Sequence, residues 1–461
     1  MLSTRKVLML AAGLAMAAPA GAQVIDSAQA KYPQPMVIQY TRPYDKRGLN
    51  MFETPKVAGA TYEGFKMTIG AAFAQQFQGL THSNNADSVN TPAVAPFPGS
   101  AGSAAIANRN RLITIGKGFN NAVANMMLNA QLAPGIRVQM TSFLSSRHHN
   151  ETWVKDGFIQ IDESPFNMPA LNSLMKYTTV KIGHFEVNYG DFHFRRSDNG
   201  QALYNPFVGN AIMDAFTTEV GAEVIFQRAG FFGVGAITNG EIRGNLARPA
   251  DRDPAHMVKL GFDRQLTDDL RVRLSGSWRS QKSAISNTLW SGDRAGSRYY
   301  FVLENYVASE AAQFSSGMIQ PGFSDEAKSI MVNPFIKFRG LEFFGMYEKA
   351  SGRKSTETVE RDVSQTMAEV VYRFLPGEKM YIGGRLNTFT GDLGITGTGL
   401  TLLDNSDVKV NRTNIGGGWF LTPNLLLKAE YVTQTYDGFG RRDIRSNGKF
   451  NGFMLEAVTT W

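Results

Sequence analysis

The sequence contains no cysteine and no long run of hydrophobic residues. In a chain of 461 residues, the lack of cysteine excludes a disulfide scaffold, a thiolate nucleophile and cysteine-ligated metals. Beyond the first 22 residues, no stretch has the roughly 18 uninterrupted apolar residues that indicate a membrane-spanning helix. These absences exclude a disulfide-rich secreted domain and a helical membrane protein.

Strong net charge is also absent. The formal charge is +7, and removal of Arg5 and Lys6 with an N-terminal leader would lower it to +5. A value this mild does not indicate a nucleic-acid partner.

Motifs for catalysis or metal binding are lacking as well. No Gly-x-Ser-x-Gly elbow occurs. His148 and His149 lie near Glu151, but adjacent side chains of an extended segment point apart, and no third ligand follows at regular spacing. We therefore predict no catalytic residues, no metal site and no cofactor, so the chain is not expected to be an enzyme.

The N-terminus has the features of an export signal. Arg5 and Lys6 precede the apolar run 7–18, and Ala20-Gly21-Ala22 is a small-residue cleavage site. We expect residues 1–22 to be a cleaved signal peptide. Residues 23–64 have little periodicity and several prolines, which predicts an irregular periplasmic extension.

From residue 65 to 461 the chain alternates apolar and polar residues with a period of two. In the last segment, Phe453, Leu455 and Ala457 share one face, and Met454 and Glu456 the other. Alternating strands with short turns between them, together with 46 glycines, are typical of a transmembrane β-barrel. In a membrane only a closed sheet satisfies the backbone groups of every strand. We therefore predict an all-β, antiparallel barrel in the cell outer membrane.

The number of strands follows from parity. Short turns such as Ala133-Pro134-Gly135 alternate with long polar loops such as 239–254. Bacterial barrels have their short turns on the periplasmic side and their long loops outside the cell, so we assign the connections in the same way. The segment 298–306 also alternates, and an even count then requires a further weak strand at 312–319. We predict about 18 strands, with 16 as the alternative if two weak segments are loops.

The polar faces of the strands should line the lumen, because an arginine at the bilayer midplane costs about 2–4 kcal/mol. Acidic residues also occur on these faces, so both signs should line the wall. The predicted lumen-facing basic residues are Arg137, Lys181, Arg271, Arg273, Arg279, Arg373 and Arg385.

The third long loop, after the strand near residue 180, is rich in aromatic and basic residues. It would narrow the pore if it folded inward, with His193, Arg195 and Arg196 forming an electropositive constriction beside Asp191 and Asp198. The alternative is an exterior loop held by its aromatic side chains.

Taken together, these features look like a general bacterial outer-membrane porin. Four stretches, Leu132–Gly135, Glu151–Lys155, Val180–Phe185 and Arg195–Gly200, are similar to the phosphate-selective porin O and P type of barrel. The resemblance implies a homotrimer whose path is lined by arginine and lysine.

We therefore predict a passive diffusion channel for small hydrophilic solutes, with a preference for anions and with outer-membrane lipid and lipopolysaccharide around it. The alternatives are a substrate-specific channel for uncharged or hydrophobic solutes, a barrel enzyme and a structural barrel. An energy-coupled receptor would require a folded plug longer than residues 23–64.

Overall fold

The computed structural model describes residues 37–90, 108–144, 152–240, 253–282, 287–290, 296–313, 315–396 and 403–461. The signal peptide and the His148-His149-Glu151 stretch lie outside these residues. Residues 37–461 form one compact unit. No helix among the described residues is long and apolar enough to cross a membrane.

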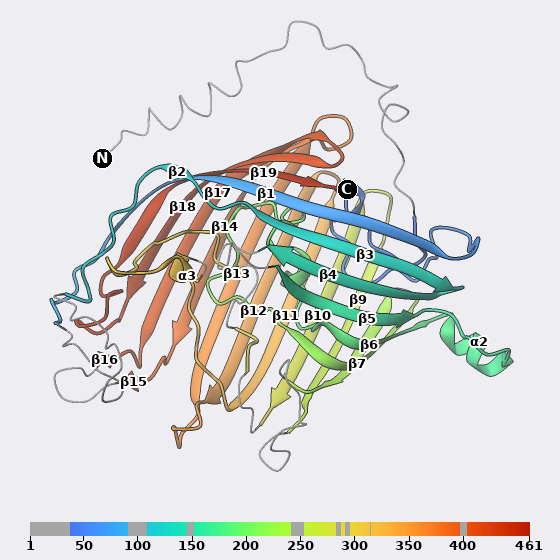
Figure 1. Ribbon diagram of the computed structural model, residues 1–461, viewed down its shortest axis with the longest axis horizontal. Coiled ribbons are helices and arrows are strands. Elements are labelled where there is room, and N and C mark those ends of the chain that lie inside the picture. The colour runs from blue at the N-terminus through green and yellow to red at the C-terminus, as the bar shows by residue number, and fades with distance from the viewer. Residues whose placement is uncertain are drawn as a thin grey trace, which may run out of the picture. The chain divides into compact units, whose positions relative to one another are not determined.

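The described strands form a closed antiparallel barrel (Figure 1). One sheet holds 17 strands, of which β2 is a two-residue strand beside β1, so the ring itself has 16. Each strand pairs with the next in the chain, and β1 pairs with β19 to close the ring. Closure leaves no sheet edge with unpaired backbone groups.

The barrel strands are β1 (Lys66–Ser83), β3 (Val123–Ala133), β4 (Ile136–Leu144), β5 (Trp153–Ile161), β6 (Thr178–Glu186), β7 (Thr218–Arg228), β8 (Phe231–Thr238), β9 (Ala255–Gln265), β10 (Leu270–Gln281), β11 (Glu326–Phe338), β12 (Leu341–Arg353), β13 (Arg361–Phe374), β14 (Met380–Gly391), β17 (Val408–Thr422), β18 (Leu425–Asp437) and β19 (Lys449–Thr460).

The other described elements are short. They are η2 (Lys46–Gly48), β2 (Gly118–Phe119), α2 (Pro169–Met175), η3 (Phe192–Phe194), α3 (Glu310–Gln313), β15 (Ile395–Thr396) and β16 (Leu403–Asp404), the last two forming a separate hairpin.

The two faces of the barrel differ as the period-two pattern predicts. On β10, Leu274 and Trp278 are exposed on the outside, whereas Arg273 and Arg279 are buried on the inside. On β19, Leu455 is exposed and its neighbour Glu456 is buried. Because successive side chains of a strand point to opposite faces, this alternation places the charged residues in the lumen.

The barrel has 16 strands and not the predicted 18. The segment 298–306 and the described residues of 312–319 form turns and the end of the short helix α3, within the long connection between β10 and β11. Tyr299 and Ile319 are apolar because they are buried inside the barrel. The apolar residues of 298–306 therefore do not mark a strand, and the strand that parity required at 312–319 is not needed. The alternative count of 16 is therefore the correct one.

The two ends of the barrel carry different connections, which we call the turn end and the loop end. Most connections at the turn end are tight: Pro134 and Gly135 join β3 to β4, and Gly135 has φ +62°. A Cβ at Gly135 would lie 2.5 Å from the side chain of Glu163, so only glycine fits. The connection from β5 to β6 is longer and contains α2, seen at the lower right of Figure 1.

The outer face generates a test of the membrane position. Leu455 is exposed near the middle of β19. We expect Leu455→Arg to lower the free energy of unfolding from lipid bilayers by about 2–4 kcal/mol, because the guanidinium would lie in hydrocarbon. Thr459→Arg, close to the end of the same face, should cost only about 0–1 kcal/mol. Equal losses for both variants in denaturant titrations would contradict a lipid-facing β19.

Candidate functional site: the barrel lumen

Residues 187–217, which connect β6 to β7, lie inside the barrel; we call them the inner loop. Nearly all of them are buried, and they bond to inward-facing side chains from most of the wall. Their contacts reach β3 through Asn125, β9 through Lys259, β14 through Asn387 and β18 through Lys428. The loop therefore crosses the lumen.

The first anchor of the inner loop is Asp191. Its carboxylate accepts hydrogen bonds from Arg273 at 2.7 Å and Ser275 at 2.7 Å, and lies 2.6 Å from the ammonium of Lys259. Burial by itself raises the pKa of Asp191, but the two cations outweigh it and hold the pKa below its usual range. Asp191 is therefore an ionised carboxylate that ties the loop to β9 and β10.

The second anchor is Arg195, which has the opposite charge. It donates to Glu369 of β13 at 2.6 Å and lies 3.8 Å from Glu342 of β12. Glu369 also accepts from Arg385 of β14, which in turn donates to the carbonyl of Gly209 at 2.7 Å. The inner loop thus supplies a carboxylate to cations of the wall and a cation to carboxylates of the wall.

The inner loop touches the wall very closely at Gly200. The amide of Gly200 donates to Asn125 at 3.1 Å, and a Cβ at this position would lie 2.2 Å from the carbonyl oxygen of Ala72. A side chain here would push the loop away from β1 and β3.

Residues 37–65 contain no described strand, and part of them lies beneath the inner loop at the turn end. Glu53 bonds to Arg273 at 2.7 Å and lies 3.0 Å from Lys259, the same two cations that hold Asp191. Arg42 lies over the ring of Tyr204 at 3.7 Å. We expected an irregular extension on the periplasmic side; its described part is irregular and packs into the lumen.

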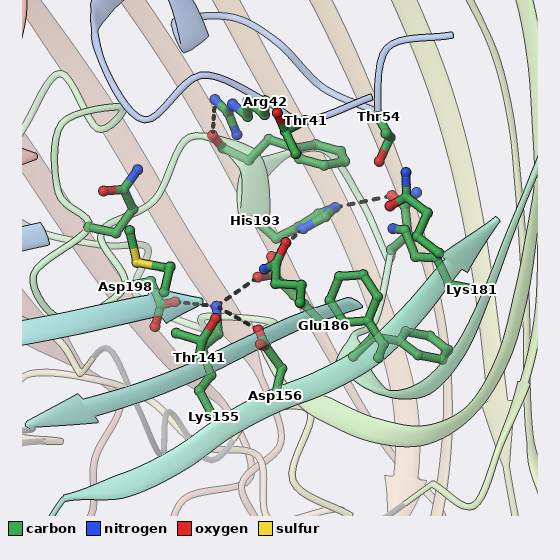
Figure 2. A pocket seen from close by; sticks show the side chains of 18 of the residues that line it. Thr41, Arg42, Thr54, Thr141, Lys155, Asp156, Lys181, Glu186, His193 and Asp198 are labelled. Atoms are coloured by element: carbon green, nitrogen blue, oxygen red, sulfur yellow. Dashed lines mark hydrogen bonds and ion pairs between the residues drawn. The ribbon is translucent and has the colours of Figure 1, made fainter. Parts of the chain in front are cut away.

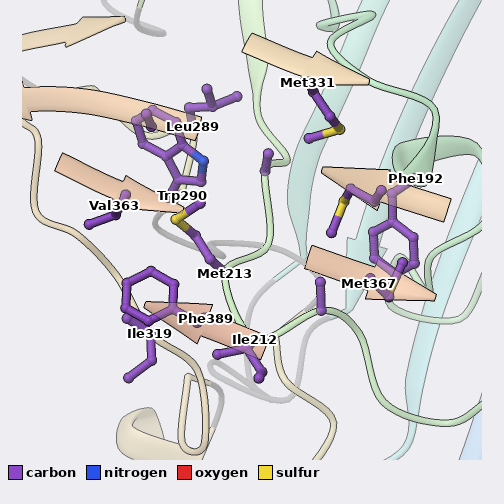
Figure 3. Close-up of a cluster of buried hydrophobic side chains, with 14 of the residues drawn as sticks. Phe192, Ile212, Met213, Leu289, Trp290, Ile319, Met331, Val363, Met367 and Phe389 are labelled. Atoms are coloured by element: carbon purple, nitrogen blue, oxygen red, sulfur yellow. The ribbon is translucent and has the colours of Figure 1, made fainter. Parts of the chain in front are cut away.

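One side of the lumen is filled by an apolar cluster (Figure 3). The inner loop contributes Phe192, Ile212 and Met213; the β10–β11 connection contributes Leu289, Trp290 and Ile319; and the strands contribute Met331, Val363, Met367 and Phe389. Packed side chains on this side leave no wide aqueous channel there, contrary to what the strand number alone implies.

A cavity of about 210 Å³ remains on the other side (Figure 2). It lies between the inner loop, residues 41–54 and the inner faces of β3 to β6. Its charged lining residues are Arg42, Arg137, Lys155, Lys181, Arg196, Glu53, Asp156, Glu186 and Asp198, together with His193. The cavity is therefore polar and carries both signs of charge.

A β-bulge on β5 shapes this lining. Thr141 pairs with Asp156 but Ser142 pairs with Val154, so Lys155 is an extra residue in the ladder. Both Lys155 and Asp156 are buried on the inner face. A bulge turns a side chain that would otherwise point outward.

Lys155 is surrounded by carboxylates. Its ammonium contacts Asp198 of the inner loop and lies 3.1 Å from Glu186 and 3.9 Å from Asp156. Glu186 also contacts the ring of His193 at 2.5 Å. Burial lowers the pKa of His193, although Glu186 counters part of this effect.

The predicted site residues fall into three groups. Those that line the cavity are Arg137, Lys181, His193, Arg196 and Asp198. Arg271 and Arg273 border a second cavity of about 460 Å³ at the turn end, beside residues 51–55. Asp191, Arg195, Arg279, Arg373 and Arg385 line neither of these cavities; each is paired, Arg279 with Glu219 and Arg373 with Glu342.

Sequence reasoning missed Lys155, Asp156, Glu186, Arg42 and Glu53 as site residues. Strict alternation places Lys155 outside, because a bulge leaves no period-two signal. Arg42 and Glu53 lie in a segment without periodicity. The one available signal was the charge pair Lys155-Asp156 in an otherwise alternating strand.

The structure thus belongs to the class of closed, 16-stranded antiparallel barrels with loops packed into the lumen. No protein-family model and no curated protein sequence matches this chain. It is similar to the solved structures of an anion-selective porin from Comamonas acidovorans (8% identity, 86% of this chain and 100% of that chain, TM-score 0.49) and of OprB from Pseudomonas putida (10%, 86% and 94%, 0.48).

It is also similar to the outer-membrane channel DcaP of Acinetobacter baumannii, at 8% identity over 87% of this chain and 99% of that chain, with a TM-score of 0.46. The function must therefore be inferred from the site itself.

The anchor at Asp191 yields a stability prediction. We expect Asp191→Asn to lower the free energy of unfolding by about 1–3 kcal/mol, because Arg273 and Lys259 would keep only Glu53 as a buried carboxylate partner and Ser275 would lose its acceptor. The midpoint of heat-induced unfolding measures this. Asp87→Asn, which breaks an exposed pair with Arg441, should cost about 0–1 kcal/mol. Similar midpoints for the two variants would contradict the anchoring role.

The loop end contains a titratable group, the carboxyl of Glu304, next to a backbone contact between two connections. The backbone carbonyl of Glu304 accepts a hydrogen bond from the amide of Ile113 at 3.0 Å, which links the β10–β11 and β1–β3 connections. Burial raises the pKa of Glu304 from 4.5 to about 7, although Arg445 opposes part of the shift. The folded carboxyl therefore keeps its proton at pH values where an unfolded one loses it.

The folded structure around Glu304 should lose stability as the pH rises from 4.5 to about 7, because its carboxyl must then ionise in a buried position. The loss should be about 3 kcal/mol at most. We expect faster hydrogen exchange of residues 108–115 at pH 8 than at pH 5, after correction for intrinsic rates. Glu304→Gln, which cannot ionise, should remove the difference. An unchanged difference in that variant would assign the pH dependence to another group.

Proposed function

We propose that this protein is an outer-membrane diffusion channel that passes small hydrophilic solutes through the polar cavity beside the inner loop. The observation that carries the proposal is the closed barrel with an apolar outer face, a charged inner face and a cavity bounded by β3 to β6. Such a barrel satisfies its own backbone in lipid and offers a polar interior to solutes.

The size of the cavity limits the solute. A volume of about 210 Å³ is smaller than the roughly 300–1,000 Å³ of sites that take drug-sized ligands. The charged lining also disfavours hydrophobic solutes, because their passage would leave the lining groups without water or partners. Small polar or ionic solutes fit the cavity best.

A modest preference for anions follows from two cations. Arg42 donates to the carbonyls of Gly48 and Phe194, and Arg137 donates to Asn129, Gln139 and Gln160. Within the described residues neither has a carboxylate within 4.0 Å, unlike Lys155, Lys181 and Arg196. The four carboxylates of the lining would repel a multiply charged anion such as phosphate. The cavity therefore favours a modest general preference for anions over phosphate selectivity.

The remaining features of the proposal concern surroundings and assembly. The loop end would face the exterior and its lipopolysaccharide, and the turn end the periplasm, after export with loss of residues 1–22. A homotrimer would use the small outward residues Ala71, Ala122 and Ala124, whereas the neighbouring small residue Gly70 is buried.

A second candidate is a structural barrel without transport. The apolar cluster and the packed connections that fill much of the lumen favour it. The two functions differ in one measurable property, because only a channel conducts ions.

Planar-bilayer recordings test the proposal. We expect discrete conductance steps in KCl and a reversal potential showing chloride more permeant than potassium. Arg137→Gln should lower the chloride-to-potassium permeability ratio, because it removes a cation of the path. Arg339→Gln, at an exposed turn beside Asp269, should leave the ratio unchanged. Absence of any conductance from correctly folded protein would instead support the structural barrel.

A further inference from the structure

The charges of the cavity are separated into two poles. The first pole is the cluster around Lys155, where Asp156, Glu186 and Asp198 converge on one ammonium. This acidic pole therefore holds three carboxyl groups for one ammonium.

The acidic pole also has unused hydrogen-bonding capacity. Asp156 is 3% exposed and Asp198 is 7% exposed. One oxygen of each, Oδ1, has no hydrogen-bond partner among the described residues. Buried carboxylate oxygens without a donor are costly, and both residues line the cavity. The missing donor is one that a cationic group in the cavity can supply.

The second pole is basic: its main group is Arg137 of β4, and the cavity lining includes a further cation without a carboxylate partner, Arg42. As described above, their partners are carbonyl and amide oxygens, so their positive charges are not neutralised by a carboxylate within 4.0 Å in the described structure. Arg137 is 5% exposed, and its Nε has no partner among the described residues. Figure 2 shows Arg42 on the far side of His193 from Lys155.

The ladder between β4 and β5 gives the separation of the poles. Arg137 donates to Gln139, and Thr141, two residues further along β4, lies opposite Asp156. Two residues of a strand span about 7 Å. Phe158 lies opposite Gln139 and Met127 opposite Thr141, so the cavity has an apolar side chain at each of these levels.

We infer that the cavity binds a small linear zwitterion, with its ammonium group at Asp156 and Asp198, its carboxylate at Arg137, and a short methylene chain against Phe158. This inference rests on the proposed channel function and names its solute class. A simple anion would be attracted by the basic pole and repelled by the acidic pole, and a simple cation the reverse. Each would therefore satisfy only one end of the cavity. A zwitterion satisfies both ends.

Four probes of similar size test this class: 4-aminobutyrate, which carries both charges, butyrate, butylammonium and the neutral butyramide. Equilibrium binding to the detergent-extracted protein is measured by calorimetry, and block of the KCl current is measured in bilayers. We expect 4-aminobutyrate to bind at least about tenfold more tightly than each of the other three, since a hydrogen bond to a charged group is worth at least that factor. Glycine, with its charges closer together, should bind more weakly than 4-aminobutyrate.

The variants Asp156→Asn and Arg137→Gln should each reduce 4-aminobutyrate binding about tenfold or more, with little effect on butyramide. Asp269→Asn and Arg339→Gln remove the same charges from an exposed turn pair and serve as matched controls. Native circular dichroism and heat-modifiable migration of each variant exclude misfolding as the cause.

The outcomes separate the two proposals. Equal binding of the four probes, or unchanged 4-aminobutyrate binding in both cavity variants, overturns the zwitterion site even if the protein conducts KCl. Selective binding that is lost in the variants supports the site. If that selective protein shows no conductance, the channel function fails while the binding site stands.

Discussion

Charged side chains inside the barrel need partners of opposite charge or water, and the ion pairs that they form with the inner loop determine its position. Sixteen strands enclose more space than their own side chains fill, so the charges of the wall must face water or other protein groups. The inner loop brings Asp191 to Arg273 and Lys259, and Arg195 to Glu369. A loop with charges of one sign could not satisfy both regions of the wall, so the acid at Asp191 and the base at Arg195 together fix where the loop lies.

The same compensation explains why the cavity lies where it does. On the side of β11 to β14 the lumen is filled by apolar side chains of the inner loop and of the β10–β11 connection. These side chains exclude water; Arg195, Arg373 and Arg385 are paired there with Glu342 and Glu369, and Glu348 accepts a hydrogen bond from Trp290. On the side of β3 to β6 the bulge at Lys155 gathers three carboxylates while Arg137 keeps only neutral partners. Solvation is therefore required on one side of the lumen and excluded from the other.

The sequence predicted the features that depend on local periodicity. The inward position of Arg273 and the outward position of Leu274 follow from alternation, and the structure has both. Alternation failed where a loop is buried: Tyr299 and Ile319 are apolar because they pack inside the lumen, not because they face lipid. The inward fold of the inner loop was one of two alternatives, because its anchors are strands more than 50 residues away in the chain.

The site was predicted less completely than the fold. Arg137 and Lys181 were recognised as inward, and both line the cavity. Their partners depend on which strands become neighbours, and Lys155 depends on a bulge, so no local pattern indicated either. Residues 37–65 have no periodicity at all, and their place in the lumen follows from ion pairs such as Glu53 with Arg273.

The seam between β1 and β19 joins the two ends of the barrel-forming chain. The inner loop touches both sides of this seam, with Gly200 against β1 and the amide of Val208 bonded to Glu430 on β18. Contacts between distant parts of a chain form slowly because the intervening segments must first be ordered. A loop already seated in the unfinished barrel can hold the two edges together, and it would have no wide opening to enter once the ring had closed. The inner loop thus connects strands on the two sides of the seam in the finished barrel.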